Sequence, residues 1–150
     1  MHISTRGRYA MRALLDVALH GETGPVSRAD ISARQDISAE YIAQLFRSLA
    51  AAGLVRGVKG PGGGYVLARD ASEIRVGDVI RAVEGPIAAT YCALPNTRPI
   101  CDRLDKCVTH QLWVELTDSI GRYLDSITLR DLCQRAHALV NQVTTSGDAA

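Results

Sequence analysis

Apolar residues near the start of the chain recur at intervals of three and four, the spacing of one face of an α-helix. The pattern predicts a helix over residues 5–20, with Ser4 or Thr5 as its N-terminal cap. Its apolar face would be formed by Met11, Leu14, Leu15, Ala18 and Leu19. The chain therefore begins with a helix that buries one side.

Two further helices are predicted close behind. Ser27 caps a short one that ends near Arg34 and turns Ile31 inward, and Ser38 caps a third of about four turns. Gly53 follows the third helix as a left-handed stop. Short helices joined by a tight turn are typical of a helix-turn-helix. The apolar side of the third helix carries Tyr41, Ile42, Leu45, Leu49 and Ala52.

A β-hairpin is predicted directly after the third helix. Residues 54–59 and 65–68 have the composition of strands, and the glycine-rich run 60–64 between them is a turn. A glycine run can also cradle phosphate, but such a loop leads into a helix, and here a strand follows. Alone, the segment would equally fit a plain hairpin. Its position after a helix-turn-helix predicts a wing.

Two longer helices are expected in the second half, after a short helix over residues 76–83. The helix over residues 108–126 carries apolar residues at intervals of 3, 4, 3 and 4, the seam of a helix that pairs with another. Because the preceding domain looks complete, we expect this helix to form a homodimer. Thr128 caps a last helix that ends near Val143. The seam consists of Trp113, Leu116, Ile120, Tyr123 and Ile127, widened by Leu112 and Leu124.

Composition and charge add little to this pattern. Apolar residues are 47% of the 150 residues, enough for a core, and the net charge of +1 gives by itself no support for nucleic-acid binding. Arg6, Arg8 and Arg12 nevertheless meet no acid until Asp16. This is a local basic patch on an otherwise balanced protein, and on charge alone a solvated helix face is its preferred interpretation.

The sequence shows no secretory signal, and no apolar run approaches the roughly 18 residues that span a bilayer. We therefore expect a cytoplasmic protein that does not interact with membranes. Thiols stay reduced in that compartment, so the four cysteines favour metal ligands or redox groups over disulfides.

The third helix is the candidate DNA-reading element, because a recognition helix contacts base edges through its first two turns. Gln44 can bond adenine in a bidentate manner, Glu40 can accept from cytosine, and Ala39 can touch a thymine methyl group. Tyr41 fits a core position equally well. The predicted base-reading set on this helix is Ser38, Ala39, Glu40, Tyr41 and Gln44.

Phosphate and minor-groove contacts are expected around that helix. Arginines contact phosphates without reading sequence, and a hairpin tip almost free of side chains can enter a narrow minor groove beside a cation. The expected phosphate-binding residues are Arg6, Arg8 and Arg47, and the wing-tip residues are Lys59, Gly60, Pro61 and Gly62.

Cys92, Cys101, Cys107 and His110 form the pattern C-x8-C-x5-C-x2-H. Three thiolates and one imidazole can hold a metal ion or an iron–sulfur cluster. A structural zinc site takes the same ligand types, but its ligands usually come in two pairs, each with a short spacing in sequence. The wide intervals here therefore favour an iron–sulfur cluster. A zinc site and redox-active thiols remain alternatives. Cys133 lies on the final predicted helix, where a buried structural thiol is expected.

The sequence resembles the IscR/NsrR-type family of winged-helix transcription regulators over nearly its whole length. The similar segments are Gly7-Arg8-Tyr9-Ala10, Leu15-Asp16-Val17-Ala18-Leu19, Ala29-Asp30-Ile31-Ser32, Tyr41 with Gln44-Leu45-Phe46, Gly60-Pro61-Gly62-Gly63-Gly64-Tyr65, Lys106-Cys107-Val108-Thr109-His110 with Leu112-Trp113, and Ile127-Thr128-Leu129.

The resemblance implies a homodimeric repressor or activator that binds a double-stranded DNA operator and controls genes of iron–sulfur cluster biogenesis. It implies one 2Fe–2S cluster per subunit on the four candidate ligands, in preference to zinc or a 4Fe–4S cluster. Gain or loss of the cluster would reorder the loop and change the spacing of two recognition helices, whose half-sites lie roughly 34 Å apart. We expect no enzyme activity and no small-molecule substrate.

Three alternatives remain at this point: a nitric-oxide or redox sensor of the same family, a zinc-stapled DNA-binding regulator, and a small redox protein that uses the cluster for electron transfer. The expected fold is mainly α with a small β wing. It comprises a winged helix-turn-helix domain, a cluster-binding loop, dimerisation helices and a disordered tail, over residues 1–85, 86–110, 108–143 and 144–150.

Overall fold

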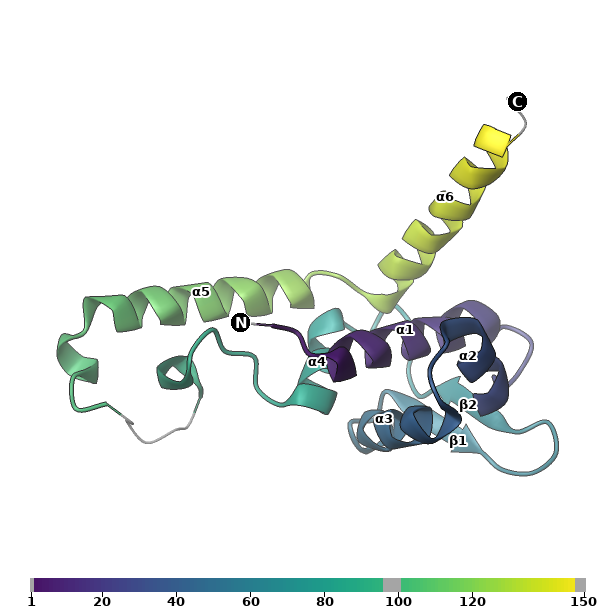
Figure 1. The fold of residues 1–150 in the computed structure, drawn as a ribbon, viewed down its shortest axis with the longest axis horizontal. Helices are drawn as coiled ribbons and strands as arrows, with labels where there is room; N and C mark the ends of the chain where they lie inside the picture. Colours follow the sequence, from purple (N-terminus) through teal and green to yellow (C-terminus); the bar gives the residue numbers. More distant parts are fainter. Residues whose placement is uncertain (1, 96–100, 148–150) are drawn as a thin grey trace.

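The structure is a computed structural model that describes residues 2–95 and 101–147 of the chain (Figure 1). Helices dominate, and the described residues form one two-stranded sheet. The fold class expected from the sequence is confirmed. The elements in chain order are α1 (Thr5–His20), α2 (Arg28–Gln35), α3 (Ala39–Ala51), β1 (Val55–Val58), β2 (Gly64–Leu67), α4 (Val76–Glu84), the 3-10 turns η1 (Tyr91–Ala93) and η2 (Leu104–Lys106), α5 (Val108–Asp125) and α6 (Leu129–Gly147).

The first three helices begin at the capping residues that the sequence indicates. Ser4, Ser27 and Ser38 each place a side-chain oxygen against the amide three residues later, which satisfies a donor at the helix start. Gly53 follows α3 with a φ of 70°, in the left-handed region. Local sequence therefore sets where each of these helices begins and where α3 ends.

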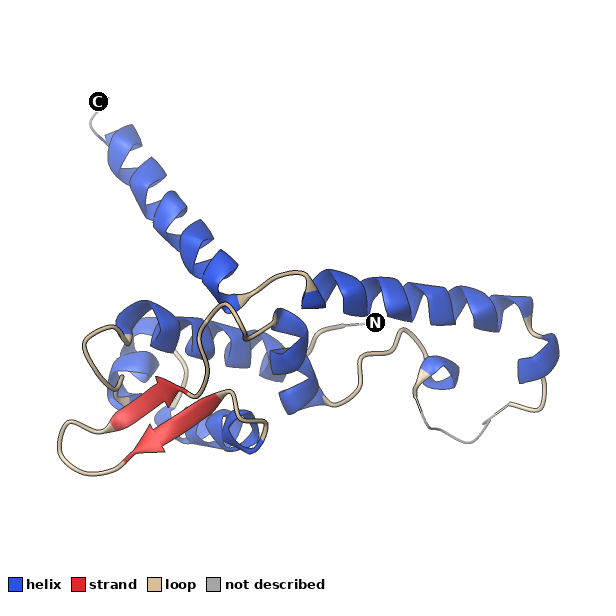
Figure 2. Ribbon diagram, turned by 180° about the vertical axis from the view of Figure 1, so that it is seen from behind, coloured by secondary structure: helices blue, strands red, loops and turns tan. Residues whose placement is uncertain are grey.

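The wing is the antiparallel pair β1 and β2, at one edge of the helical body (Figure 2). Val55 pairs with Leu67 at the base, and Val58 pairs with Gly64 next to the tip. A second pairing joins the wing to the segment before α2, since Val26 and Tyr65 exchange two backbone hydrogen bonds of 2.9 and 2.8 Å. The wing is thereby fixed to the helix-turn-helix.

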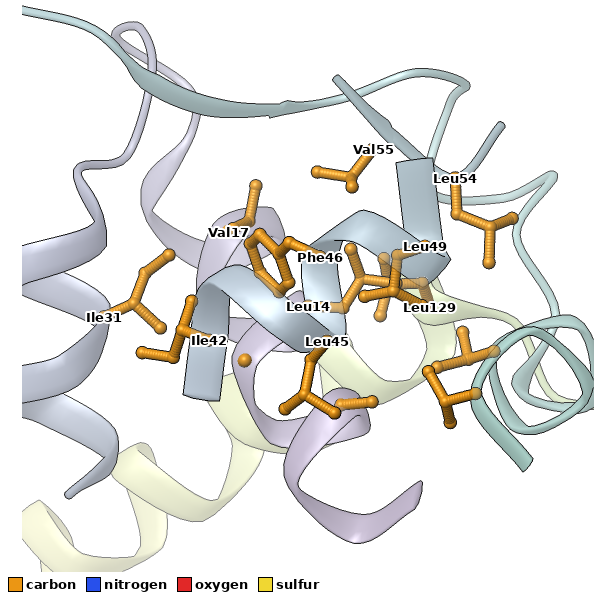
Figure 3. Packing of buried hydrophobic residues seen from close by; sticks show 14 of the residues in the cluster. Leu14, Val17, Ile31, Ile42, Leu45, Phe46, Leu49, Leu54, Val55 and Leu129 are labelled. Atoms are coloured by element: carbon orange, nitrogen blue, oxygen red, sulfur yellow. The ribbon is translucent and has the colours of Figure 1, made fainter. Parts of the chain in front are cut away.

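The core lies between α1, α2, α3 and α4 (Figure 3). Leu129, the first residue of α6, also belongs to it and is 1% exposed. Its amide donates to the carbonyl of Ile74, and Thr128 pairs with Arg75 as an isolated bridge. The winged-helix body thus includes a residue far beyond residue 85. The central buried side chains are Leu14, Val17, Ile31, Ile42, Leu45, Phe46, Leu49, Leu54 and Val55.

The α5 helix extends away from this body, and α6 projects in a different direction (Figure 1). No described side chain of α5 is fully buried. The predicted seam is divided between two sides: Ile120 and Leu124 line a groove that also includes Ile80 of α4, whereas Leu116 and Tyr123 are exposed. The heptad spacing correctly indicates an apolar stripe, but part of the stripe packs on the same chain.

The structure corrects the extent of the tail. Residues 144–147 continue α6, where a disordered segment was expected, and residues 148–150 lie outside the described residues. The hydroxyl groups of Thr144, Thr145 and Ser146 donate to carbonyl oxygens three or four residues earlier, from Val140 to Gln142. These bonds give hydroxyl partners to carbonyls in the last turns of the helix.

Candidate nucleic-acid interface and metal-ligand segment

The outward side of α3 carries the polar residues predicted to read DNA. Glu40, Gln44 and Arg47 are exposed, and Ser38 is exposed at the cap. Ala39 is half-buried. The opposite side of α3 is buried in the core through Ile42, Leu45, Phe46 and Leu49, which leaves the predicted reading face free.

Tyr41 occupies an intermediate position between the core and the reading face. Its ring is half-buried and meets the ring of Tyr9 edge-on, with 6.1 Å between the centroids. Arg12 lies over the other ring of this pair, 5.4 Å from the centroid of Tyr9, and its guanidinium also donates to Gln35. Tyr41 is therefore held by α1 while the residue stays partly accessible.

The N-terminal arginines lie on α1, and one of them contacts α3. Arg6 is exposed and donates to the hydroxyl of Ser48 on α3 at 3.2 Å, and Arg8 is exposed and donates to Thr5 at 3.4 Å. Arg47 and Lys59 make no hydrogen bond or ion pair within the described part of the chain. These cationic side chains are available to phosphate.

The wing tip is a tight turn of exposed residues. Lys59, Gly60, Pro61 and Gly62 are all exposed, and the amide of Gly63 donates to the carbonyl of Gly60 at 3.0 Å. At Gly64 a side chain would collide with the carbonyl oxygen of Val26. Part of the glycine run is therefore explained by the close approach of the segment before α2.

Asp16 is a residue whose role the sequence did not reveal. Its carboxylate is fully buried, accepts two hydrogen bonds from Arg34 Nε and Nη2 at 2.9 and 2.7 Å, and accepts another from Gln35 at 2.9 Å. The pKa of Arg34 is raised, first by this hydrogen bond. The pair fixes α1 to α2. The signal in the sequence that could have indicated this role is an acidic residue within the apolar segment Leu15–Ala18.

Three of the four predicted metal ligands lie between α4 and α5, and the fourth, His110, lies in the first turn of α5. Cys92 is half-buried in η1, with its sulfur 3.2 Å from the hydroxyl of Thr90; Cys101 is exposed. Cys107 immediately precedes α5, and its pKa is lowered by a hydrogen bond with Thr109, then by the amide of His110 and the charge of Arg103. A lowered pKa favours the thiolate, the form that binds metals.

His110 lies in the first turn of α5, and its amide donates to the carbonyl of Cys107 at 3.1 Å. Its Nδ1 atom is buried without a hydrogen-bond partner among the described residues. An unsatisfied buried polar atom is costly, so this nitrogen suits a ligand-binding role.

The described residues do not contain a group of three or more histidine, cysteine or acidic side chains close enough to hold a metal ion. Cys107 and His110 share one helical turn, while Cys92 and Cys101 lie on separate parts of the loop around residues 96–100, which are outside the described range. Cys133 is half-buried on α6, and burial raises the pKa of its thiol. This environment agrees with a structural thiol.

Helices α2 and α3 form a helix-turn-helix and β1 and β2 form its wing, the architecture of a winged-helix DNA-binding domain. The Rrf2 family, described as iron-dependent transcriptional regulators, matches residues 3–135 of the sequence, and the chain belongs to this family. Within the described residues, none of the helices has the length and apolar character needed to cross a membrane.

Individual relatives agree with this assignment. The HTH-type transcriptional regulator IscR of Serratia proteamaculans is 49% identical over 140 residues, 93% of this chain and 84% of that protein. IscR of Photorhabdus laumondii is 50% identical over 139 residues, covering 93% and 83% of the two chains. Both relatives are named as regulators of transcription, so the function class expected from the sequence is confirmed.

Solved structures show the same fold. The structure of T. potens IscR matches with a TM-score of 0.72 and 39% identity, over 91% of this chain and 88% of that one. CymR of B. subtilis, the global cysteine regulator of that organism, matches with a TM-score of 0.74 and 33% identity, over 90% and 98% of the two chains.

Proposed function

We propose that this chain is a homodimeric regulator that senses iron–sulfur clusters in the cytoplasm and binds operator DNA accordingly. The observation that carries the proposal is the buried, unpartnered Nδ1 of His110, one helical turn from the thiol of Cys107. The iron dependence of the family and the relatives named IscR support it.

The donor set fits a 2Fe–2S cluster. Cys92, Cys101 and Cys107 would supply three thiolates and His110 an imidazole. Such a cluster supplies one-electron redox chemistry and a local charge that changes when it is oxidised, reduced or lost. For all four donors to bind one cluster, the loop that carries Cys92 and Cys101 would close on the first turn of α5.

The DNA contacts follow from the exposed face of the winged helix. The first turns of α3 would enter the major groove with Glu40 and Gln44 toward the bases, while the wing tip beside Lys59 follows the minor groove. Arg6, Arg8 and Arg47 would contact phosphates, and Ser38, Ala39 and Tyr41 complete the reading face.

The apolar outer face of α5 supports a homodimer. Val108, Leu112, Leu116 and Tyr123 are exposed on it, and a large exposed apolar patch generally marks an interface. His110 lies in the first turn of α5. Loop closure at that end would therefore act on the helix that sets the distance between the two α3 helices of the dimer. Two half-sites about 34 Å apart make affinity sensitive to that spacing.

The test begins with protein purified without oxygen. We expect visible absorption and equal amounts of iron and sulfide, lost on replacing any of the four ligands (C92S, C101S, C107S or H110A). C133S is the matched control, since it removes a thiol outside the proposed site and should keep the absorption. Binding to a duplex selected by the wild-type protein from a random pool should differ at least about tenfold between cluster-loaded and cluster-free protein.

Other results would point elsewhere. Equal DNA affinity with and without the cluster would remove the sensing function but leave an operator-binding protein. A colourless preparation with bound zinc would indicate a zinc-stapled regulator. If stoichiometric nitric oxide abolishes absorption and DNA binding together, nitric oxide is a signal that the protein can read.

A further inference from the structure

Glu84, the last residue of α4, reaches the N-terminal end of α1. Its Oε1 accepts three hydrogen bonds: from the amide of Ser4 at 2.9 Å, the hydroxyl of Ser4 at 2.7 Å and the amide of Gly7 at 3.0 Å. A carboxylate in this position satisfies free helix donors and complements the positive end of the helix dipole. Glu84 thus supplements the serine cap from a residue about 80 positions away in sequence.

Gly7 makes this contact possible. A side chain at position 7 would collide with Oε1 of Glu84, and would also meet Ile3 at 2.9 Å. Gly7 is buried within a helical turn, where alanine would otherwise be favoured by roughly 1 kcal/mol. The glycine is therefore explained by space for the Glu84 carboxylate rather than by its backbone conformation.

The turn that Glu84 holds carries the cations proposed to bind phosphate. Arg6 lies between the two residues that Glu84 contacts and donates to Ser48 on α3, and Arg8 follows Gly7. The α4 helix is also joined to α5, because Arg81 forms two hydrogen bonds of 2.9 and 2.7 Å with Asp125. The chain leaves α4 at Gly85 and continues directly into the segment with Cys92.

We propose that Glu84 is a positioning residue for DNA binding: it holds the first turn of α1, so that Arg6 is ordered beside α3 and Arg8 is held on the same turn. The role makes α4 the element that joins the metal-ligand segment and α5 to the phosphate-binding turn. The proposal rests on the proposed DNA-binding function. It goes beyond that function by assigning a role to a residue that contacts no DNA.

Electrostatics and positioning predict opposite results for a neutral substitution. Removing an acid from a DNA-binding protein should by itself leave affinity unchanged or raise it. If Glu84 positions the arginines, E84A should instead weaken binding at least threefold. Losing a helix cap destabilises the ordered turn by a free energy that corresponds to about this factor in an equilibrium constant. E22A is the matched control: Glu22 is an exposed acid without hydrogen bonds or ion pairs in the described chain, and its loss should not weaken binding.

Gly7 provides a second test that leaves the charge unchanged. G7A should displace the Glu84 carboxylate and weaken binding in the wild-type background, but should not weaken it further in the E84A background. Affinity is measured by fluorescence anisotropy on the duplex selected by the wild-type protein, well below each variant's Tm. Amide exchange of Ser4 and Gly7, followed by NMR in the free full-length protein, should accelerate in E84A and G7A but not in E22A.

The outcomes separate the two proposals. Failure of the wild-type protein to bind any duplex would contradict the proposed function itself. If the wild-type protein binds and E84A binds within threefold of it or more tightly, the positioning role is wrong. It is also wrong if G7A weakens binding equally with and without Glu84. If E84A does not fold, G7A is judged by the same threefold criterion.

Discussion

At the scale of single residues, buried polar groups mark what each part of the molecule depends on. Asp16 is fully buried and satisfied by Arg34 and Gln35, so it has a structural role between α1 and α2. The Nδ1 of His110 is buried and unsatisfied within the described chain, which instead suits a ligand. The two cases differ only in whether the protein itself supplies the partner.

Replacing Asp16 with alanine should lower the free energy of unfolding by about 2 kcal/mol, because it leaves the guanidinium of Arg34 without its partner. We place the value below that of a fully buried pair, since the Arg34 side chain is 36% exposed. Urea unfolding followed by circular dichroism measures the change. E22A removes an exposed acid without hydrogen bonds or ion pairs in the described chain and is the control, and a loss below about 0.5 kcal/mol in D16A would contradict the role.

Gln44 and Arg47 should respond differently to alanine. Q44A should relax the preference for one base and cost about 1–3 kcal/mol on the selected duplex only. R47A should weaken binding about equally on all duplexes and reduce the slope of log K against log salt by about one. Binding titrations of both variants on the selected duplex and on scrambled duplexes, at several salt concentrations, test these two expectations. If Q44A loses affinity equally on all sequences, Gln44 does not read a base.

At the scale of elements, α4 connects otherwise separate parts of the fold. One side of it enters the core through Val79 and Val83, and its charged residues contact α1 and α5. The hydrogen bond from Arg81 lowers the pKa of Asp125 below its usual range. A carboxyl with a lowered folded-state pKa stabilises above its unfolded-state pKa, and that stabilisation is lost as the pH falls through the folded-state value.

D125N should therefore lower the free energy of unfolding near neutral pH, by about 0.5–1 kcal/mol because both side chains are about a third exposed. The difference from wild type should shrink as the pH falls below the unfolded-state pKa of an aspartate, about 3.9, toward the lowered folded-state value at which the wild-type carboxyl takes up its proton. Urea titrations at each pH measure it. Asp70 and Asp131 also have lowered pKa values, but they titrate in both proteins, so their contributions cancel in the difference between wild type and D125N. A difference in the free energy of unfolding that does not change with pH would contradict the assignment.

At the scale of the whole molecule, the chain leaves apolar surface on both terminal helices. Leu112, Leu116 and Tyr123 are exposed on α5, and Leu139, Val140 and Val143 are exposed on α6. Both helices project from the winged-helix body (Figure 1). A second copy that covers α5 would bury this surface and place two reading faces on one duplex.

L116E combined with Y123E should produce a monomer, because two carboxylates in an apolar interface are not compensated. Operator affinity should fall at least about tenfold, since each half-site is then bound separately. Light scattering coupled to size exclusion measures the mass. D118A, an exposed polar position on the same helix, should remain dimeric, and a dimeric double variant would place the interface elsewhere.

Much of the local structure was predictable because its causes are local. Ser4, Ser27 and Ser38 indicate helix starts through hydrogen bonds only three residues long, and the position of the glycine run indicates the wing. The types of the candidate ligands are likewise a property of the sequence, and so is the exposed side of α3. The sequence by itself therefore determined the elements, their order and the residues available for chemistry.

The tertiary structure decided which residues meet. Periodicity shows that a helix has an apolar side but not what covers it, so the division of the α5 stripe and the place of Leu129 in the core were not predictable. The contacts of Asp16 with Arg34 and of Glu84 with Gly7 join charged groups to distant partners, and neither leaves a periodic signal. Such contacts depend on the packing of whole helices, which no local pattern encodes.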